Sequence, residues 1–292
     1  MEEVISKEKL LFEAPLENDA DRFDRLKKYD RQNNGVILYR YRHVSQDTPY
    51  EIAALSDCKV WASNPKYFDD ENEFLPSCSS RKDYECLRYF ANWMLEKSND
   101  GVAKKKMAEL DKVYHKNPKM LFSFFIRELE KERCQFAVSC FTENGPFDDK
   151  NMWHQYAKDS GICLAYSLST LVSAKVVIDP VYYIEPEMNT LGTIFELFGK
   201  NYRASLSFCI KDKYGIDKYG DPTEKIYWEK QNEWRYAIDN IFDETSKEYS
   251  RGRYLDCKIV PDAIYVKNLK LGLLLKVIKA ANKNKIPVRL VL

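Results

Sequence analysis

The sequence has few of the residues on which many catalytic and metal sites depend. Its 292 residues include only three histidines, His43, His115 and His154, which leaves little room for a histidine-based triad or a histidine-rich metal centre. The ten glycines form neither a GxGxxG motif nor a P-loop pattern, so a glycine-rich phosphate loop is not its organising feature. The eight cysteines include no CxxC pair, and we therefore expect no bound metal and no redox motif.

The chain also lacks a long apolar run, a basic leader and an excess of charge of either sign. Its first residues, MEEVISKEKLLFEAPLEND, are acidic and mixed, which is not typical of a signal peptide. No stretch approaches the roughly 20 apolar residues of a membrane span. Acidic and basic residues nearly cancel at +1, so no global field draws the protein to nucleic acid or membrane. We expect a soluble, cytoplasmic protein with reduced thiols and no membrane partner; the oligomeric state is not predicted.

The sequence does hold enough apolar and aromatic residues for a substantial core. Hydrophobic residues make up 45% of the chain and aromatic residues 14%, as expected for a globular protein. Strand-like runs such as VILYRYRHV and GICLAYS flank a section with helical periodicity, and a further helix is expected from about residue 186 to 211. The pattern predicts an α+β fold with a mainly antiparallel mixed sheet. We expect a peripheral helical segment at 1–34 and a single α+β domain at 35–292, with a helical insert at about 80–133.

Two strand-like stretches carry polar side chains on one face. If YWEKQNEWRY is extended from Gln231 onward, Gln231, Glu233 and Arg235 project to the same side because side chains alternate along a strand. In VILYRYRHV, Arg40 and Arg42 share a face in the same way. The ordinary interpretation is a half-buried sheet with one solvated face. The alternative is that both polar faces line a cleft.

Four blocks of the chain form a distinctive series. They are LYRYR, VWASNPKYFDD, SCFTEN with MWHQYAKDSGICLAYS, and WEKQNEWR. Their order and spacing resemble an uncharacterised bacterial family known as domain of unknown function 2971. The resemblance covers roughly Leu38 to Gly272, and the chain departs from the family after Phe68, where Asp-Asp-Glu replaces the usual Asn-Asp-Pro. The family name supplies no activity, but the resemblance implies that these blocks converge in the fold.

A second series consists of an arginine on an early strand, a serine followed by an aromatic residue, and a Gln-x-Glu pair. Its members are Arg40 or Arg42, Ser63 with Phe68 downstream, and Gln231 with Glu233. This order resembles the arginine-serine-glutamate class of ADP-ribosyltransferases. The resemblance implies an ADP-ribosyltransferase-like split sheet, NAD as the substrate and a protein or nucleic acid as the acceptor. It is typical of a toxin or defence effector, and hydrolysis of NAD by a glycohydrolase is equally open.

Cleavage of NAD requires groups of these types. The reaction passes through an oxocarbenium-like transition state, which the carboxylate of Glu233 would stabilise while Gln231 faces the acceptor. The guanidinium of Arg40 or Arg42 would hold phosphate oxygens in bidentate fashion. Ser63 would bond the nicotinamide ribose or position Glu233. The rings that would stack on nicotinamide are Tyr39, Trp61 and Phe68.

Each of these residues also has an ordinary structural interpretation. Glu233 and Arg235 would form a surface cross-strand pair that contributes under about 1 kcal/mol. The two arginines of the early strand would pair with Glu233 or with the acidic residues 69–70. Ser63 would cap the turn that follows it. The aromatic residues expected in the core are Trp153, Tyr156, Trp228 and Trp234.

Two other functions are open at this point. The first is a non-catalytic nucleotide- or nucleic-acid-binding module of a bacterial defence or stress system. The aromatic content and the lysines of KNLKLGLLLKVIKAANKNK indicate this function. The second is a metal-dependent nuclease that uses a cluster of carboxylates, although the same residues are typical of an exposed acidic loop. These carboxylates are Asp69, Asp70, Glu71 and Glu73.

These interpretations predict different geometry. Cleavage of NAD requires that the strands carrying Arg42, Ser63 and Glu233 surround one cleft. A catalytic Glu233 replaced by glutamine should lose activity while the free energy of unfolding changes by less than about 1 kcal/mol. A buried structural ion pair would instead make the same change destabilising by roughly 3 kcal/mol or more.

Overall fold

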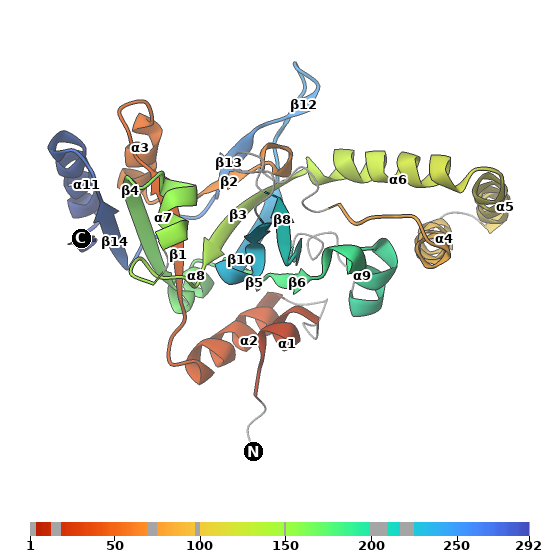
Figure 1. Ribbon diagram of the computed structural model, residues 1–292, viewed down its shortest axis with the longest axis horizontal. Helices are drawn as coiled ribbons and strands as arrows, with labels where there is room; N and C mark the ends of the chain where they lie inside the picture. Colours follow the sequence, from red (N-terminus) through yellow and green to blue (C-terminus); the bar gives the residue numbers. More distant parts are fainter. Residues whose placement is uncertain are drawn as a thin grey trace.

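Strand-forming runs from most of the chain assemble into one large mixed sheet of nine strands, which forms the centre of the molecule in Figure 1. The computed structural model describes residues 4–12, 19–68, 75–96, 100–148, 150–198, 209–216 and 225–291. The strands of the main sheet are β1 (Ile37–His43), β2 (Trp61–Ser63), β3 (Phe136–Thr142), β4 (Gly161–Ser167), β5 (Asp179–Pro180), β10 (Glu233–Asp239), β13 (Gly252–Tyr254), β14 (Ala263–Lys267) and β15 (Val288–Leu290). Its strand pairs are antiparallel except that of β14 with β15. The predicted α+β fold with a mainly antiparallel mixed sheet is confirmed.

β1 is held along its whole length on one side. Its residues pair with β4 in antiparallel register, from Ile37 opposite Ser167 to His43 opposite Gly161. Gly161 is required at this position because a Cβ atom there would lie 2.1 Å from the carbonyl oxygen of Arg42. β14 and then β15 extend the sheet beyond β4, so β1 is firmly anchored to this half of the sheet.

On its other edge, β1 meets β3 at one position. Tyr39 lies opposite Thr142, and no other pair joins these two strands in the described part of the chain. Farther along the same edge of β3, β2 takes the place of β1, with Ser63 opposite Val138. β10 follows the opposite edge of β3, beginning with Glu233 opposite Thr142. β1 and β3 therefore separate after this one pair. Side chains occupy the opening that this separation leaves in the sheet.

The apolar faces of the sheet and its helices form the main core. Leu38 of β1 and Trp234 of β10 are fully buried in it, and Tyr29 from the N-terminal helices joins them. The helices around the sheet are α1 (Lys7–Phe12), α2 (Asp19–Gln32), α3 (Pro49–Asp57), α7 (Lys150–Ala157), α8 (Leu168–Ser173) and α11 (Leu271–Lys283). α8 begins after Ser167, whose hydroxyl accepts a hydrogen bond from the backbone N–H of Thr170 at 3.2 Å. Such a cap satisfies a donor that the first helical turn leaves free.

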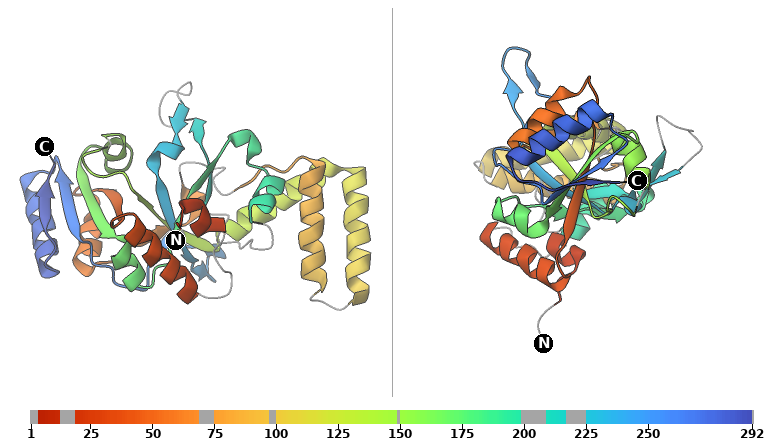
Figure 2. Two further views of the ribbon diagram at one scale, coloured as in Figure 1. Left: turned by 90° about the horizontal axis from the view of Figure 1, so that it is seen from below. Right: turned by 90° about the vertical axis from the view of Figure 1, so that its left-hand side faces the viewer.

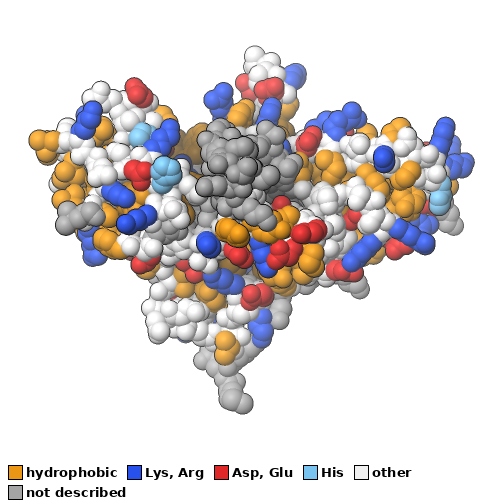
Figure 3. Space-filling model, viewed as in Figure 1, with side chains coloured by type: hydrophobic (Ala, Val, Ile, Leu, Met, Phe, Trp, Pro, Cys, Tyr) orange, Lys and Arg blue, Asp and Glu red, His pale blue; other side chains and the backbone are white. Residues whose placement is uncertain are grey.

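Three further helices extend away from the sheet as an arm, which Figures 1 and 2 show from three directions. They are α4 (Arg81–Glu96), α5 (Asp100–Lys116) and α6 (Pro118–Arg133). The rings of Tyr84 and Tyr114 stack between α4 and α5, with their centroids 3.6 Å apart. Apolar side chains and basic residues are exposed along this arm in Figure 3. Met120 and Phe124 of α6 are among the exposed apolar residues of the chain. The section from 80 to 133 contains no strand in its described part, as its helical periodicity predicted.

Short elements complete the described chain. They are the 3-10 turns η1 (Pro65–Tyr67), η2 (Pro186–Met188) and η4 (Trp228–Gln231), helix α9 (Leu191–Phe198), and the strand pairs β6 (Tyr182–Ile184) with β7 (Ile210–Asp212), β8 (Tyr214–Ile216) with β9 (Lys225–Tyr227), and β11 (Phe242–Asp243) with β12 (Glu248–Tyr249). The helix predicted from about 186 to 211 is wrong at its end, because β7 runs parallel to β6 there. Residues 199–208 of that prediction lie outside the described residues. Within the described ranges, no helix is long and apolar enough to cross a membrane.

Replacing Leu38 by alanine should lower the free energy of unfolding by about 2–5 kcal/mol, because the fully buried side chain leaves a cavity in the core. The matched control is Leu275→Ala in α11, where the leucine is 57% exposed and the change should stay within about 0.5 kcal/mol. Urea unfolding followed by circular dichroism measures both. Equal effects of the two substitutions would contradict the position of the core.

Candidate functional site

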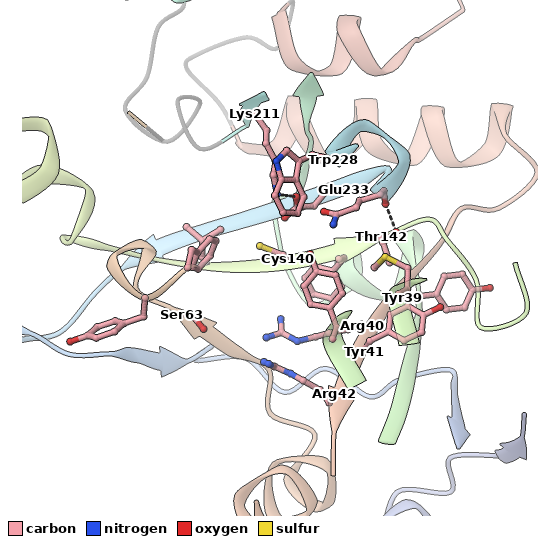
Figure 4. A pocket seen from close by; sticks show the side chains of 17 residues that line it. Tyr39, Arg40, Tyr41, Arg42, Ser63, Cys140, Thr142, Lys211, Trp228 and Glu233 are labelled. Carbon is pink, nitrogen blue, oxygen red and sulfur yellow. Dashed lines mark hydrogen bonds and ion pairs between the residues drawn. The ribbon is translucent and has the colours of Figure 1, made fainter. Parts of the chain in front are cut away.

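A cavity of about 230 Å³ lies where β1 separates from β3. Figure 4 shows the side chains that line it. They are Tyr39, Arg40, Tyr41 and Arg42 of β1; Ser63, Tyr67 and Phe68 from the end of β2 and the turn after it; Val138, Cys140, Phe141 and Thr142 of β3; Met152 and Tyr156 of α7; and Lys211, Trp228, Gln231 and Glu233 from β7, η4 and β10. The opening in the sheet thus gathers side chains from five strands that are far apart in the sequence.

Seven of the eight residues predicted for a site line this cavity. They are Tyr39, Arg40, Arg42, Ser63, Phe68, Gln231 and Glu233. Trp61, the eighth, is not among the lining residues; its ring stands edge-on to Tyr254 at 5.0 Å, and its indole N–H donates to the hydroxyl of Ser63 at 3.0 Å. The strands that carry Arg42, Ser63 and Glu233 therefore meet at one cavity, whereas the indole of Trp61 contacts the site through the hydroxyl of Ser63.

Glu233 is the centre of a buried ion cluster at one wall of the cavity. Its Oε1 accepts a hydrogen bond from Nε of Arg235 at 2.9 Å, and its Oε2 accepts one from Nη2 of the same guanidinium, also at 2.9 Å. Nζ of Lys211 lies 3.2 Å from Oε2. All three side chains are buried. The predicted surface pair of Glu233 and Arg235 is therefore wrong in one respect: the pair exists, but it is buried and has a third member.

Burial and the charges around Glu233 act on its pKa in opposite directions. Burial alone would raise the pKa of this carboxyl, but the positive charges of Arg235 and Lys211 outweigh that effect and lower the pKa from 4.5 to about 2. A hydrogen bond from the Cys140 thiol lowers the pKa further. Glu233 is consequently ionised at neutral pH, and its negative charge is compensated within the cluster.

The turn before β10 sets the positions of Gln231 and Glu233. Gln231 belongs to η4 and not to the strand, so the predicted strand beginning at Gln231 is wrong. Asn232 has a left-handed backbone with φ of 46°, a conformation that asparagine tolerates better than most residues. The backbone carbonyl of Gln231 accepts a hydrogen bond from the hydroxyl of Thr142, and its side chain donates to Gln155 at 3.3 Å. Gln231 therefore lines the cavity through a turn that is pinned to β3.

Arg40 is a buried cation on the opposite wall. Its Nη2 donates to the backbone carbonyl of Trp61, and its guanidinium lies 5.6 Å from the ring centroid of Phe141. Its Nη1 has no hydrogen-bond partner among the described residues. Burial, with the nearby charge of Arg42, lowers the pKa of Arg40 to about 9, so it is still charged at neutral pH. Arg40 is therefore a buried anion-binding group, and no described acidic side chain forms an ion pair with it, whereas Glu233 is paired with two cations.

Of the acidic partners predicted for the two arginines, Glu233 forms its ion pairs with other residues. Arg42 Nε is 3.9 Å from a carboxylate oxygen of Glu51 in α3, at the long limit of an ion pair. Glu233 pairs with Arg235 and Lys211 instead. Residues 69–70 lie outside the described part of the chain, as does the rest of the acidic run proposed for a nuclease. In the described ranges, no group of three histidine, cysteine or acidic side chains is placed to hold a metal ion.

Several lining residues were not predicted from the sequence. Lys211 was expected at the end of a helix, but it lies on β7 with its ammonium 4.5 Å from the ring centroid of Trp228. Trp228 was predicted in the core and lines the cavity instead. Its indole fits closely against Gly215, where a Cβ atom would lie 2.6 Å from Nε1. The sequence could have identified Trp228 as a lining residue, because Trp228 is the first residue of the WEKQNEWR motif that contains Glu233.

Other structural predictions have mixed outcomes. Trp153 and Trp234 are fully buried, which confirms their place in the core, whereas Tyr156 is exposed at the cavity. The turn after β2 is capped by Asn64, whose side-chain oxygen accepts from the backbone N–H of Lys66 at 3.0 Å. The hydroxyl of Ser63 is thus not the cap and faces the cavity.

The charge and shape of the lining indicate what the cavity can bind. Among the described lining residues, Arg40, Arg42 and Lys211 bring three positive charges to it, against the single carboxylate of Glu233. The aromatic rings among them offer flat surfaces for stacking; these are Tyr39, Tyr41, Tyr67, Phe68, Phe141, Tyr156 and Trp228. An anionic ligand with a planar ring matches both properties.

The comparisons with known proteins found no relative. No family model matches the chain, and no curated protein and no solved structure matches it. The resemblances to the two families therefore stay predictions, and function has to be argued from the cavity.

Replacing Glu233 by glutamine should lower the free energy of unfolding by about 3 kcal/mol or more, because Arg235 and Lys211 would be left buried without a negative partner. This replaces the sequence-based expectation of a change below about 1 kcal/mol. Glu229→Gln, at an exposed position of the same turn, is the matched control and should be nearly neutral. Urea unfolding compares the variants, and an unchanged Glu233→Gln protein would contradict the buried cluster.

The stability that Glu233 contributes should disappear in acid. Its pKa falls from 4.5 to about 2 on folding, so the contribution is fully present above the unfolded-state pKa and is lost as the pH drops through the folded-state pKa. The difference in unfolding free energy between wild type and Glu233→Gln should therefore shrink between about pH 5 and about pH 2. A difference that stays constant over this range would show that the carboxyl is not stabilised as an anion.

Proposed function

We propose that this cavity binds NAD and that the protein is an ADP-ribosyltransferase-like enzyme or NAD glycohydrolase. The reaction would break the bond between nicotinamide and ribose and transfer ADP-ribose to a protein, a nucleic acid or water. The observation that carries the proposal is the meeting of Arg42, Ser63 and Glu233 at one cavity. These residues come from three strands that are distant in the sequence, and independent surface residues would have no reason to converge.

The opening between β1 and β3 supports the finer prediction of a split sheet. In the proposed arrangement the ligand lies in this opening, with its phosphates toward Arg40 and Arg42. A buried guanidinium that lacks an acidic partner gains stability from an anion, and the free Nη1 of Arg40 is such a donor among the described residues. The planar nicotinamide ring would stack on Tyr39 or Phe68, which both line the cavity.

Glu233 would stabilise the positive charge that develops on the ribose. The carboxylate is ionised at neutral pH because its pKa is lowered, and it needs no proton transfer to act as an electrostatic partner. Ser63 would bond a ribose hydroxyl, with its own hydroxyl held by the indole N–H of Trp61. Nicotinamide would leave with the bonding electron pair, and the acceptor would attack from the side of the ribose that faces Gln231.

A second candidate function is nucleotide binding without cleavage. It is favoured by the hydrogen bonds that Glu233 already accepts: two from Arg235, one from Lys211 and one from the Cys140 thiol. A carboxylate offers about four acceptor sites, so these bonds leave little capacity for a ribose hydroxyl. In a binding module the cluster would hold β10 in place, and the arginines alone would recognise the ligand.

The test is to incubate the purified protein with NAD and to measure free nicotinamide, alone and with added protein or nucleic acid. The wild type should release nicotinamide, and Glu233→Gln should be slower by about 10²–10³-fold, the usual effect of losing a preorganised electrostatic group. Glu229→Gln, outside the cavity, should keep the wild-type rate. Because Glu233→Gln is destabilised, its assays are run below its melting temperature, and Ser63→Ala provides a second variant with a smaller structural effect.

Binding of ADP-ribose, measured by calorimetry, separates the two candidate functions. Binding together with nicotinamide release supports the enzyme. Binding without release, under every acceptor condition, supports the module. A cavity that binds neither NAD nor ADP-ribose would contradict both.

A further inference from the structure

Cys140 is a nucleophilic side chain of the cavity that the proposed reaction does not use. It lies on β3 directly opposite Arg235 of β10, and it lines the cavity. Four of the eight cysteines are buried away from solvent, namely Cys58, Cys86, Cys163 and Cys209, and four are half-buried, namely Cys78, Cys134, Cys140 and Cys257. Cys140 is thus accessible from a space that is shaped to receive a ligand.

The surroundings of Cys140 carry an excess of positive charge. Arg235 lies across the strand pair, and Arg40 interacts electrostatically with the same sulfur. Lys211 lines the same cavity. Glu233, which accepts a hydrogen bond from the thiol, offsets one of these three positive charges through its ion pairs with Arg235 and Lys211, so positive charge remains in excess. Cations near a cysteine favour the thiolate, which is the reactive form.

A second and independent feature points to an anionic partner for this thiol. Arg40 is 8% exposed and lines the cavity, and its Nη1 has no hydrogen-bond partner among the described residues. Figure 4 shows the sulfur of Cys140 between Glu233 and the guanidinium of Arg40 in that view, with Ser63 lining the same cavity. An incoming reagent with a negative group would therefore be held beside the sulfur. The rings of Phe68 and Phe141 also line this space and favour an aromatic reagent.

We propose that Cys140 is a modification site at which a small anionic disulfide forms a mixed disulfide with the protein. The thiol loses its proton to solvent, and the thiolate attacks one sulfur of the small disulfide. A new bond joins Cys140 to that sulfur, the original sulfur–sulfur bond breaks, and the other half leaves as a thiolate that carries the electron pair. The protein thiol is oxidised and the small disulfide is reduced. A thiol reductant reverses the step, so occupation of the cavity becomes sensitive to redox conditions.

The other half-buried cysteines provide internal controls. Burial raises the pKa of Cys134 and of Cys257, and burial together with Asp83 and Cys86 raises the pKa of Cys78 to about 12. The thiol of Cys134 also donates to the backbone carbonyl of Glu130 at 3.3 Å. These cysteines should therefore react slowly with any disulfide and without preference for an anionic one.

The experiment exposes the fully reduced protein to two aromatic disulfides at neutral pH, anionic dithiobis(nitrobenzoate) and neutral dithiodipyridine. Mass spectrometry of peptides at successive times measures the modification of each cysteine. Cys140 should react first with the anionic reagent and at least about tenfold faster than Cys134 or Cys257, because a positively charged cavity raises the local concentration of an anion. The preference should be smaller with the neutral reagent. Inorganic pyrophosphate should slow the reaction of Cys140 alone. A first reaction at another cysteine, or an equal preference with both reagents, would overturn the proposal.

Two variants sharpen the result. Cys140→Ser should remove the fast phase, and Arg40→Met should remove most of the preference for the anionic reagent while leaving reaction with the neutral one. If Arg40→Met does not fold, protection of the wild type by pyrophosphate still decides the point. Neither readout requires NAD, so a reactive Cys140 without nicotinamide release would retain this inference and contradict the proposed enzyme. Nicotinamide release with an unreactive Cys140 would do the reverse.

Discussion

The separation of β1 from β3 after a single residue pair is the constraint on which the site depends. Strands that stop pairing leave backbone groups that must find other partners, because buried unsatisfied groups are costly. Side chains of the two separated strands bridge to β2 instead: Arg40 of β1 and the hydroxyl of Ser139 of β3 both donate to the carbonyl of Trp61. β2 is thereby fixed beside β3, and Arg40 is drawn into the opening. The cavity exists because side chains complete a sheet that its backbone leaves incomplete.

The two buried charges at the cavity are stabilised in different ways. Glu233 lies between two cations, and this arrangement holds β10 against β7 through Lys211 as well as lowering the pKa of the carboxyl. Arg40 has a backbone carbonyl and an aromatic ring but, among the described residues, no carboxylate within ion-pair distance, and its pKa is lowered instead. A buried charge without a counterion opposes folding. The folded protein tolerates this free-energy cost at Arg40, and an anionic ligand is the simplest group that would lower it.

The sequence predicts those parts of the site that depend on interactions between residues close together in the chain. Alternation along a strand is local, so the shared faces of Arg40 with Arg42 and of Glu233 with Arg235 could be read from neighbouring residues. Lys211 could not be found in this way, because it reaches Glu233 through the pairing of β7 with β6, which no local pattern encodes. The apolar spacing before it is equally typical of a helix. The turn at η4 was also missed, because it depends on the left-handed backbone of Asn232.

The position of Glu233 couples stability to any function of the cavity. A surface carboxylate would have allowed the two to be altered separately, but here the same oxygens that face the cavity also hold Arg235 and Lys211. A ligand that competes for Lys211 would loosen the contact between β7 and β10, while its own negative charge would replace part of what Glu233 provides. Binding and local stability are then linked through one ammonium group. An anion that enters this cavity must therefore match the cluster of Glu233, Arg235 and Lys211 in both charge and position. This requirement is more selective than attraction to a positively charged cavity alone.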